Sequence, residues 1–281
     1  MFDHYIVTRF NLRREDWTHN KRQQVVLTDL WLKNRFELFT NFCFSSVAAQ
    51  TNKNFTWLVY FDVNTPETYK EKIKDLENAS AQFRPVFVDG MTQFLPDLQS
   101  KLAASPKEYV ITSGLDNDDC LSIHFVNEVQ KQFNKQDYLA LDFIDGYTLQ
   151  ITPQVRVGYK LQKFNPFISL IEKNENPKGM YYRKHMHWKY ETKLKTIGDC
   201  RIWSSIIHEE NMINEFTGFS KVDINYFLTH FKLSKQKQEF ILANNVPQNK
   251  WFITSFRNYL DSYFKYYNKI LKRKLGLYKE K

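Results

Sequence analysis

The chain has 281 residues and is 42% hydrophobic and 16% aromatic, which is enough apolar material for a sizeable core and argues against disorder. Its net charge of +9 is uneven, because residues 250–281 carry nine Lys or Arg against two acids, a local +7 that leaves +2 for the other 249 residues. Nucleic-acid binders usually spread positive charge over a recognition face, so this distribution disfavours that class.

Cysteine usage and the N-terminal segment predict a cytoplasmic protein. Cys43, Cys120 and Cys200 lie far apart and form no Cys-x-x-Cys pair, so neither a disulfide framework nor a zinc site is indicated. Residues 1–12 lack the long apolar core of a signal peptide, and no stretch approaches the roughly 18 uncharged apolar residues of a membrane span. We expect a cytoplasmic setting, with peripheral contact to the inner face of the membrane as an open alternative.

Strand and helix patterns alternate along the first half of the chain. Apolar runs predict strands at residues 4–10, 55–62, 84–89 and 138–144, and another that starts at Tyr109. Helical spacing and cap residues predict the intervening helices, which are a helix with Leu32, Phe36, Phe39, Cys43 and Val47 on one face, a helix starting at Thr65 and Pro66, a helix over 94–104, and a helix capped by Ser122.

This alternation predicts a single α/β domain with an open, mostly parallel, Rossmann-like sheet. Ligands of such sheets bind outside the carboxyl ends of the strands. Polar residues fall at or just beyond these ends at Thr8, Arg9, Asp62, Asp89 and residues 116–119. We therefore expect four strands to deliver polar groups to one edge of the sheet.

After Gly146 the alternation of strands and helices weakens. The next clear pattern is a C-terminal helix with one basic side. We expect a catalytic domain over residues 1–230 and a basic, aromatic-rich helical extension over residues 231–281. The apolar stripe could pack on the domain and leave a solvated basic face, or it could lie in a membrane interface; both interpretations stay open. The stripe consists of Phe256, Tyr259, Leu260, Tyr263, Tyr267, Ile270 and Leu271, opposed by Arg257, Lys265, Lys269, Lys272 and Arg273.

Asp116, Asn117, Asp118 and Asp119 follow the strand that starts at Tyr109. Three carboxylates within four positions repel one another unless a cation or strong hydrogen-bond donors neutralise them. Mg²⁺ and Mn²⁺ suit such oxygen-rich clusters and commonly bridge one or two carboxylates to substrate phosphates. An Asx-turn with a helix cap is the structural alternative, but capping needs one acid where three are present. The cluster predicts a metal-assisted diphosphate site.

A set of motifs resembles one family when taken together. The set is Thr8-Arg9-Phe10-Asn11-Leu12, Ser46-Val-Ala-Ala-Gln-Thr51, Phe55-Thr-Trp-Leu-Val-Tyr-Phe-Asp62, Phe83-Arg-Pro-Val-Phe-Val88, Leu115-Asp-Asn-Asp-Asp119 and Ile206-Ile-His-Glu-Glu-Asn211. It resembles the bacterial putative rhamnosyltransferase family, from the N-terminus to about residue 215. The resemblance implies a GT-A fold and a metal-dependent glycosyltransferase. Such an enzyme would move a sugar, rhamnose by the family label, from a nucleoside-diphosphate sugar to a saccharide or lipid-linked saccharide in surface polysaccharide synthesis.

The resemblance also implies roles for individual residues. GT-A enzymes carry an Asp-x-Asp motif at the end of a central strand, and its second Asp coordinates the divalent ion on the sugar-nucleotide diphosphate. By that analogy Asp118 is a ligand of Mn²⁺ or Mg²⁺, Asp119 is a supporting carboxylate at the metal, and His208 is the third ligand, with His185 and His187 as competitors. The nucleotide-sugar-binding residues implied in this way are Thr8, Arg9, Asp62, Asp89 and Asp116.

The sequence indicates less directly which residue is the catalytic base and which basic residue would steady the diphosphate. Direct displacement at the anomeric carbon needs a carboxylate to accept the acceptor's proton, and Glu172, after an apolar run, is the first candidate because partial burial would raise its pKa. Glu209 and Asp145 stay open. The family often has an Arg before the Asp cluster where this chain has Ser113-Gly114, so Arg9 or Arg84 would have to supply the cation.

Two other functions are compatible with parts of the sequence. A metal-dependent sugar nucleotidyltransferase also places carboxylates beside a diphosphate, but the Gly- and Lys-rich N-terminal loop expected of such enzymes is missing. A non-catalytic module that binds a membrane surface or nucleic acid through the basic tail leaves the acidic cluster unexplained, since carboxylates repel phosphate without a metal.

Overall fold

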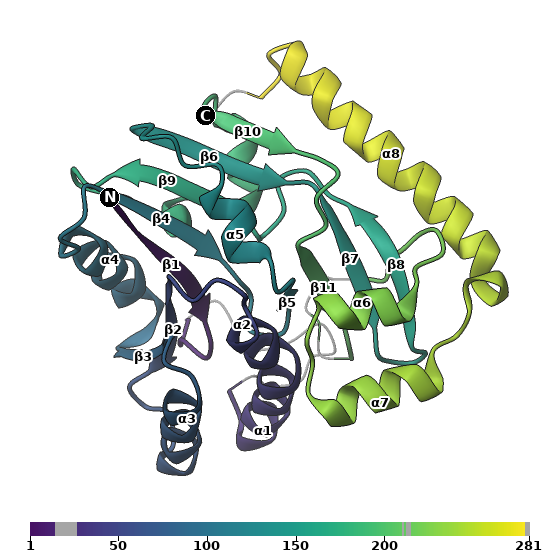
Figure 1. The fold of residues 1–281 in the computed structure, drawn as a ribbon, viewed down its shortest axis with the longest axis horizontal. Coiled ribbons are helices and arrows are strands. Elements are labelled where there is room, and N and C mark those ends of the chain that lie inside the picture. Colours follow the sequence, from purple (N-terminus) through teal and green to yellow (C-terminus); the bar gives the residue numbers. More distant parts are fainter. Residues whose placement is uncertain (15–26, 210, 212–214, 279–281) are drawn as a thin grey trace.

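A seven-stranded sheet forms the centre of the protein (Figure 1). The structure, a computed structural model, describes residues 1–14, 27–209, 211 and 215–278. Every neighbouring pair of strands in this sheet is parallel except that β9 runs antiparallel to both β4 and β6, so the predicted mostly parallel sheet is confirmed. In spatial order the strands are β10 (Leu194–Ile197), β6 (Tyr138–Phe143), β9 (Ser169–Lys173), β4 (Tyr109–Gly114), β1 (Phe2–Arg9), β2 (Thr56–Asp62) and β3 (Phe83–Val88).

Helices cover both faces of this sheet, which explains the near-continuous apolar runs of its strands. On one face, Ile6 and Val59 share an apolar cluster with side chains of α1, α3 and α5. On the other, Val7 and Leu58 pack with Phe94 of α4. The helices are α1 (Asp29–Leu38), a π-helical segment (Phe39–Phe44), α2 (Ser45–Ala48), α3 (Glu67–Ala79), α4 (Gly90–Ala103) and α5 (Phe125–Gln130).

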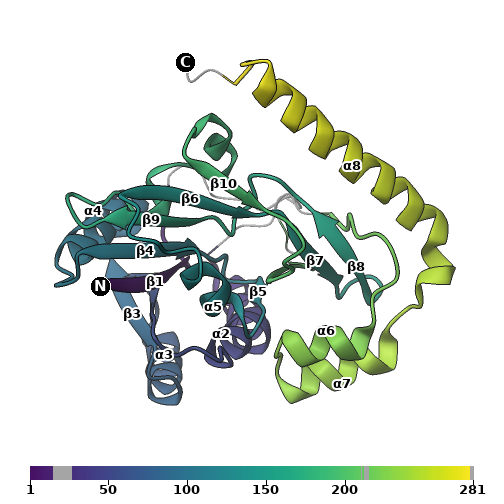
Figure 2. The same ribbon diagram turned by 45° about the horizontal axis from the view of Figure 1, so that its top comes forward.

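A second, four-stranded sheet lies beside the first and was not predicted from the sequence (Figure 2). Its order is β5-β11-β7-β8, and α6 and α7 pack on it through an apolar cluster that includes Phe227 and Ile241. Helix α6 ends at the expected domain boundary, His230; the division itself stays a prediction. The elements are β5 (Cys120–Leu121), β7 (Asp145–Gln150), β8 (Arg156–Leu161), β11 (Trp203–Ile207), α6 (Ile224–His230) and α7 (Lys235–Asn244), with short 3₁₀ turns at Met180–Tyr182, His185–Tyr190 and Gln248–Trp251.

The long C-terminal helix α8 (Phe252–Lys274) packs beside β8 through its polar side. Asn258 Nδ2 donates to the Gly218 carbonyl at 3.0 Å, Lys269 Nζ donates to the Lys163 carbonyl at 2.7 Å, and Ser262 is buried. Two members of the predicted apolar stripe, Tyr259 and Tyr263, also pack on Phe219, with ring centroids 5.6 and 6.1 Å apart. Most of the stripe is exposed instead, so it packs on the domain only in part. Among the described residues, no helix is both long and apolar enough to cross a membrane.

Candidate active site at the carboxyl edge of the sheet

The acidic turn, residues Asp116–Asp119, lies at the carboxyl end of β4, as predicted. The amide of Leu115 donates to the Val7 carbonyl at 3.1 Å, which continues the pairing of β4 with β1 up to the turn. Asn117 Nδ2 donates to the carbonyl of Phe10 at 2.8 Å and to that of Arg9 at 3.2 Å. These bonds hold the acidic turn against the end of β1.

Asp118 is the centre of the site. Its Oδ2 accepts a hydrogen bond from Arg35 Nη1 at 2.7 Å and lies 2.9 Å from His208 Nε2. The side chains of Arg35 and His208 are only 7% and 4% exposed. Burial works to raise the pKa of Asp118, but the nearby Arg35 guanidinium and the hydrogen bond with His208 outweigh it and hold the pKa well below its usual range. The carboxylate is therefore charged and paired.

Two segments far apart in the chain supply these partners. Arg35 lies on α1, and its Nη1 also donates to Asn117 Oδ1 at 3.1 Å. His208 directly follows β11, and its amide donates to Asn211 Oδ1 at 2.7 Å. Asn211 Nδ2 in turn donates to the Ile206 carbonyl at 3.3 Å, which fixes the turn that carries His208.

Asp119 is turned into the protein rather than toward Arg35 and His208. It is almost fully buried, and its Oδ1 accepts the amide of Ile206 at 2.9 Å. Burial, followed by the charges of Asp118 and Asp116, raises its pKa well above the usual value. Burial also lowers the pKa of neighbouring Lys160 to about 8, against the effect of Asp119. Asp119 thus ties the acidic turn to β11.

Asp116 is partly buried and lies within electrostatic reach of Arg9. Burial raises its pKa, and the Arg9 charge opposes that rise. The Arg9 guanidinium lies 4.5 Å from the ring centroid of Tyr181, a cation–π distance that orients it. The structure therefore brings the predicted residues Arg9, Asp116, Asp118 and His208 to one edge.

Asp62 and Asp89 are joined by Arg13, which the sequence did not single out. Arg13 Nε lies 2.9 Å from both carboxylate oxygens of Asp62, and its Nη2 contacts Asp89. The amide of Asn64 also donates to Asp62 at 3.0 Å. The two predicted carboxylates lie together, but both contact this guanidinium.

Thr8 lies beside the start of the acidic turn but has a buried side chain, whereas Arg84 lies on the outer strand β3. The Thr8 hydroxyl is fully buried and accepts a hydrogen bond from Trp57 Nε1 at 3.0 Å, so this side chain is engaged inside the protein, and its contact with a nucleotide stays a prediction. Arg84 is exposed on β3, and its Nη1 donates to the Phe83 carbonyl at 2.8 Å. The cation beside the Asp cluster is Arg35, with Arg9 near Asp116, rather than Arg84.

The structure also separates Glu172 from the acidic turn, which contradicts its expected role as the base. Glu172 lies on the antiparallel strand β9 and pairs with Val110, near the start of β4. The acidic turn follows Gly114 at the other end of β4, about 13 Å of strand away. Burial raises the pKa of Glu172, as expected, but its carboxylate accepts the amides of Lys178 at 3.1 Å and Gly179 at 2.8 Å.

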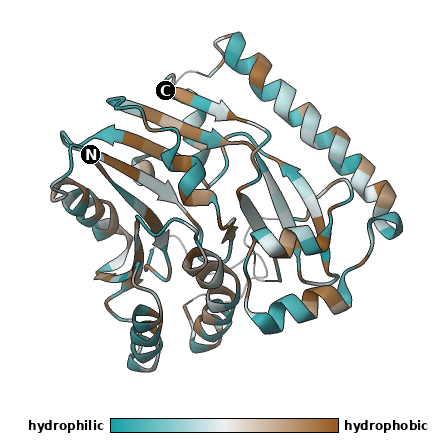
Figure 3. Ribbon diagram, in the orientation of Figure 1, coloured by the Kyte–Doolittle hydropathy of each residue, from teal (hydrophilic) through white to brown (hydrophobic). Residues whose placement is uncertain are grey.

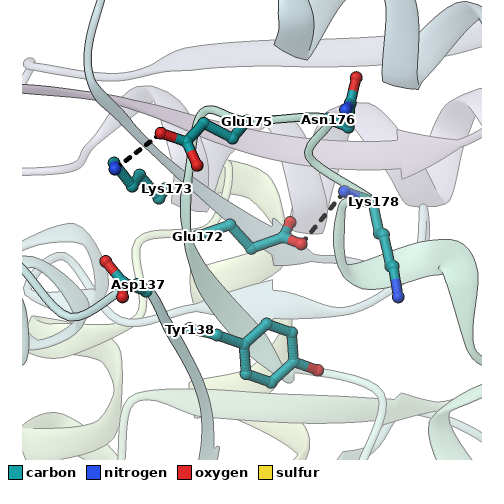
Figure 4. A pocket seen from close by; sticks show the side chains of 7 residues that line it. All are labelled: Asp137, Tyr138, Glu172, Lys173, Glu175, Asn176 and Lys178. Carbon is teal, nitrogen blue, oxygen red and sulfur yellow. Dashed lines mark hydrogen bonds and ion pairs between the residues drawn. The ribbon is translucent and has the colours of Figure 1, made fainter.

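Glu172 instead forms part of a cavity of about 290 Å³ at this opposite edge (Figure 4). Figure 4 shows its carboxylate turned toward the backbone of Lys178, with Tyr138 below and the Lys173–Glu175 ion pair to one side. These contacts indicate a carboxylate that organises the loop after β9.

The described residues provide too few metal-coordinating groups to hold a divalent ion without a bound substrate. Within the described residues, no group of three or more His, Cys, Asp and Glu side chains gathers as a metal site. Two atoms that can coordinate a metal do lie together, His208 Nε2 and Asp118 Oδ2, which are 2.9 Å apart. This is about the spacing of adjacent ligand atoms in an octahedron with metal–ligand bonds of about 2.1 Å. Mg²⁺ is usually bound by one or two carboxylates plus substrate phosphates, so this pair fits an ion that arrives with a diphosphate.

The family model described as putative rhamnosyl transferase matches residues 3–218. The chain belongs to this family. The matched region contains the acidic turn, Arg35 and His208, and ends before α8. Membership confirms the resemblance inferred from the motifs. A search of curated proteins finds no significant match.

Several solved structures are distantly similar. S. aureus TarS, residues 1–349, has a TM-score of 0.41 at 11% identity, over 73% of this chain and 60% of that one. The same TarS fragment in complex with UDP has a TM-score of 0.42 at 10% identity, over 86% and 70%. A protein described as a putative nucleotide-diphospho-sugar transferase from Desulfovibrio desulfuricans G20 has a TM-score of 0.37 at 10% identity, over 75% and 84%. The chain thus spans about 60% of the first of these structures.

Proposed function

We propose that this protein transfers a sugar from a nucleoside-diphosphate donor to a saccharide or lipid-linked saccharide acceptor, using Mn²⁺ or Mg²⁺. The observation that carries the proposal is the convergence of Arg35 and His208 on Asp118 at the carboxyl edge of a parallel sheet, within the family match. Rhamnose as the sugar is suggested by the family description, and bacterial surface polysaccharide as the product belongs to the same proposal.

The ion would be held by Asp118 and His208 and completed by the donor's diphosphate. When bound, it would supply Lewis-acid stabilisation of the charge that develops on the departing nucleoside diphosphate. Arg35 keeps Asp118 ionised and fixes its orientation, so the carboxylate is ready for a cation at neutral pH. Arg9, held against Tyr181, adds a second positive charge beside Asp116 at the same edge.

The remaining residues of this edge have proposed supporting roles. Arg13 holds the ends of β2 and β3 together through Asp62 and Asp89, and this cross-link shapes the part of the edge farthest from His208, where we place the nucleoside. Glu209 follows His208 directly and replaces Glu172 as our candidate base. A carboxylate next to the metal ligand can accept the acceptor's proton without crossing the sheet.

Donor binding tests the proposal most directly. UDP-, GDP- and dTDP-sugars are screened by thermal shift with and without Mn²⁺ or Mg²⁺, and we expect one donor to raise the melting temperature by roughly 5 °C at a hundredfold excess over its Kd, only with metal. Asp118→Asn should remove this metal-dependent shift. Asp137→Asn, in the wall of the cavity at the opposite edge, is the matched control and should keep it.

A metal-dependent shift that survives in Asp118→Asn would show that the site is misassigned. The reaction product provides the second check. A glycosyltransferase releases nucleoside diphosphate, whereas formation of a sugar nucleotide with release of pyrophosphate would identify a nucleotidyltransferase and overturn the proposal.

A further inference from the structure

Helix α8 exposes a continuous row of large apolar side chains. Seven of them are between 52% and 84% exposed, although most are aromatic or branched residues that usually contribute to cores. Figure 3 shows α8 at the margin of the molecule, with apolar segments recurring along its whole length. We call this row the α8 ridge; it consists of Ile253, Phe256, Leu260, Phe264, Tyr267, Leu271 and Leu275.

The opposite side of α8 faces the protein and is held mainly by hydrogen bonds, beside ring contacts of Tyr259 and Tyr263 with Phe219. Ser255 accepts the amide of Ser220 at 2.8 Å, and Arg273 Nη2 donates to the Glu191 carbonyl at 2.7 Å. Together with the bonds of Asn258 and Lys269 to backbone carbonyls, these contacts fix the rotation of the helix about its axis. The ridge therefore faces outward because the packed side is held by directional bonds.

The spacing of the ridge keeps it on one side of α8 and does not match a left-handed coiled coil. Its members follow one another at steps of 3, 4, 4, 3, 4 and 4 residues from Ile253 to Leu275. At 100° per residue this 11-residue repeat drifts by only about 40° over the 22 residues, and all seven side chains fall within an arc of roughly 100°. A heptad seam, which winds around a second helix in a left-handed coil, would need steps of 3 and 4 in strict alternation.

Positive charge accompanies the ridge. Helix α8 carries six Lys or Arg and a single acid, Asp261, which pairs with Lys265 at 2.6 Å. Arg257, Lys272 and Lys274 are exposed, as is Lys250 just before the helix. Two copies of the chain that joined their ridges would bring these cations together and repel each other, whereas an anionic surface would attract them.

We propose that α8 docks this protein on an anionic lipid bilayer, with the α8 ridge inserted at the boundary between headgroups and acyl chains. Interfacial helices bury an apolar face about 5–10 Å into that boundary and gain further attraction from each cation near anionic headgroups. The cytoplasmic leaflet has the required negative charge. This surface is separate from the acidic turn and does not depend on the proposed transferase activity.

Vesicle sedimentation of the full chain tests the docking. We expect binding to vesicles of phosphatidylcholine with phosphatidylglycerol, weak binding to phosphatidylcholine alone, and weaker binding as salt rises. Phe264→Ser should lower the apparent affinity about tenfold or more. The matched control is Phe240→Ser on α7, which removes an exposed phenylalanine outside the ridge and should leave binding unchanged.

The contribution of the positive charges to vesicle binding is tested in the same assay. Lys272→Gln should weaken binding to the anionic vesicles about fivefold, and Lys235→Gln on α7 should not. Asp118→Asn should bind vesicles as the unmodified chain does, which separates this proposal from the proposed function. Equal behaviour of Phe264→Ser and Phe240→Ser, or no binding to anionic vesicles, would overturn the docking. So would a dimer in size-exclusion chromatography that Phe264→Ser dissociates, because the ridge would then be a subunit interface.

Discussion

The acidic turn and the α8 ridge both reverse the usual distribution of side chains, but in opposite directions. At the acidic turn, ionisable groups are buried or partly buried, and two of them have defined partners: Asp118 contacts Arg35 and His208, and Asp119 accepts a backbone amide. On α8, apolar groups are exposed and the polar side forms the contacts with the protein. Under the two proposals, the turn is a pre-organised site for a small ligand, whereas the ridge requires an external surface to bury its side chains.

The largest effect on folding is expected at the buried ion pair. Arg35→Gln leaves the Asp118 charge without its guanidinium in a buried setting, so we expect the free energy of unfolding to fall by about 3 kcal/mol or more. Urea denaturation at neutral pH measures it. Lys237→Gln is the control, because it breaks an exposed pair with Glu37 and should cost less than about 1 kcal/mol. Equal losses in the two variants would mean that the acidic turn is not held by its charge pairing.

The proposed base gives the largest expected effect on catalysis without loss of stability. Glu209→Gln should lower kcat by about a hundredfold or more, since it removes the proton acceptor and keeps the shape. Glu172→Gln, at the opposite edge of the sheet, should leave kcat within about twofold of the unmodified enzyme and affect stability instead. If an assay of product release showed a larger loss of kcat in Glu172→Gln than in Glu209→Gln, Glu172 would again be the candidate base.

The prediction of Glu172 as the base failed because the direction of its strand could not be inferred from the sequence. Local patterns predicted the first half of the sheet, because strands covered on both faces have continuous apolar runs. The sequence gives no comparable signal that β9 runs antiparallel, and this reversal moves the end of β9 to the edge opposite Asp118. The second sheet was missed because β5 has only two residues and pairs with β11, more than 80 residues later.

The acidic turn was predictable, but its partners were only partly so. Three acids in four positions are a local signal, and His208 was found through a family motif. Arg35 lies 83 residues before Asp118 on a helix where the readable signal was the apolar spacing of Leu32 and Phe36. A charged residue beside a buried helical face is usually read as solvent-exposed, so only the folded arrangement identifies Arg35 as part of the site.

His4 shows what burial does to a titratable group without an opposite charge, in contrast to Asp118. It is buried on β1, with Nε2 2.9 Å from Ser113 Oγ, and burial lowers its pKa from 6.5 to about 3. The unfolded chain therefore binds more protons between these values, and stability falls as the pH drops below 6.5. Between pH 7 and pH 5 this group alone should cost about 2 kcal/mol.

Comparison of two variants isolates the His4 contribution. His4→Phe should lose less stability between pH 7 and pH 5 than the unmodified chain, by about that 2 kcal/mol, whatever its stability at pH 7. His187→Gln, in an exposed position, should keep the full pH dependence. If denaturation curves at the two pH values show the same loss for His4→Phe and the unmodified chain, the acid sensitivity comes from other groups.

The smallest expected effect is the change in the free energy of unfolding when a side chain of the α8 ridge is replaced. It contrasts with the large loss expected at the acidic turn. Phe264 is 70% exposed, so its replacement by Ser removes little packed surface, and the free energy of unfolding should change by no more than about 0.5 kcal/mol. The same substitution is expected to weaken vesicle binding tenfold, whereas Arg35→Gln should do the opposite and destabilise the fold with vesicle binding retained below the melting temperature. A large loss of stability in Phe264→Ser would mean that the ridge is covered by the protein itself, since an apolar side chain can stabilise folding only where folding buries it.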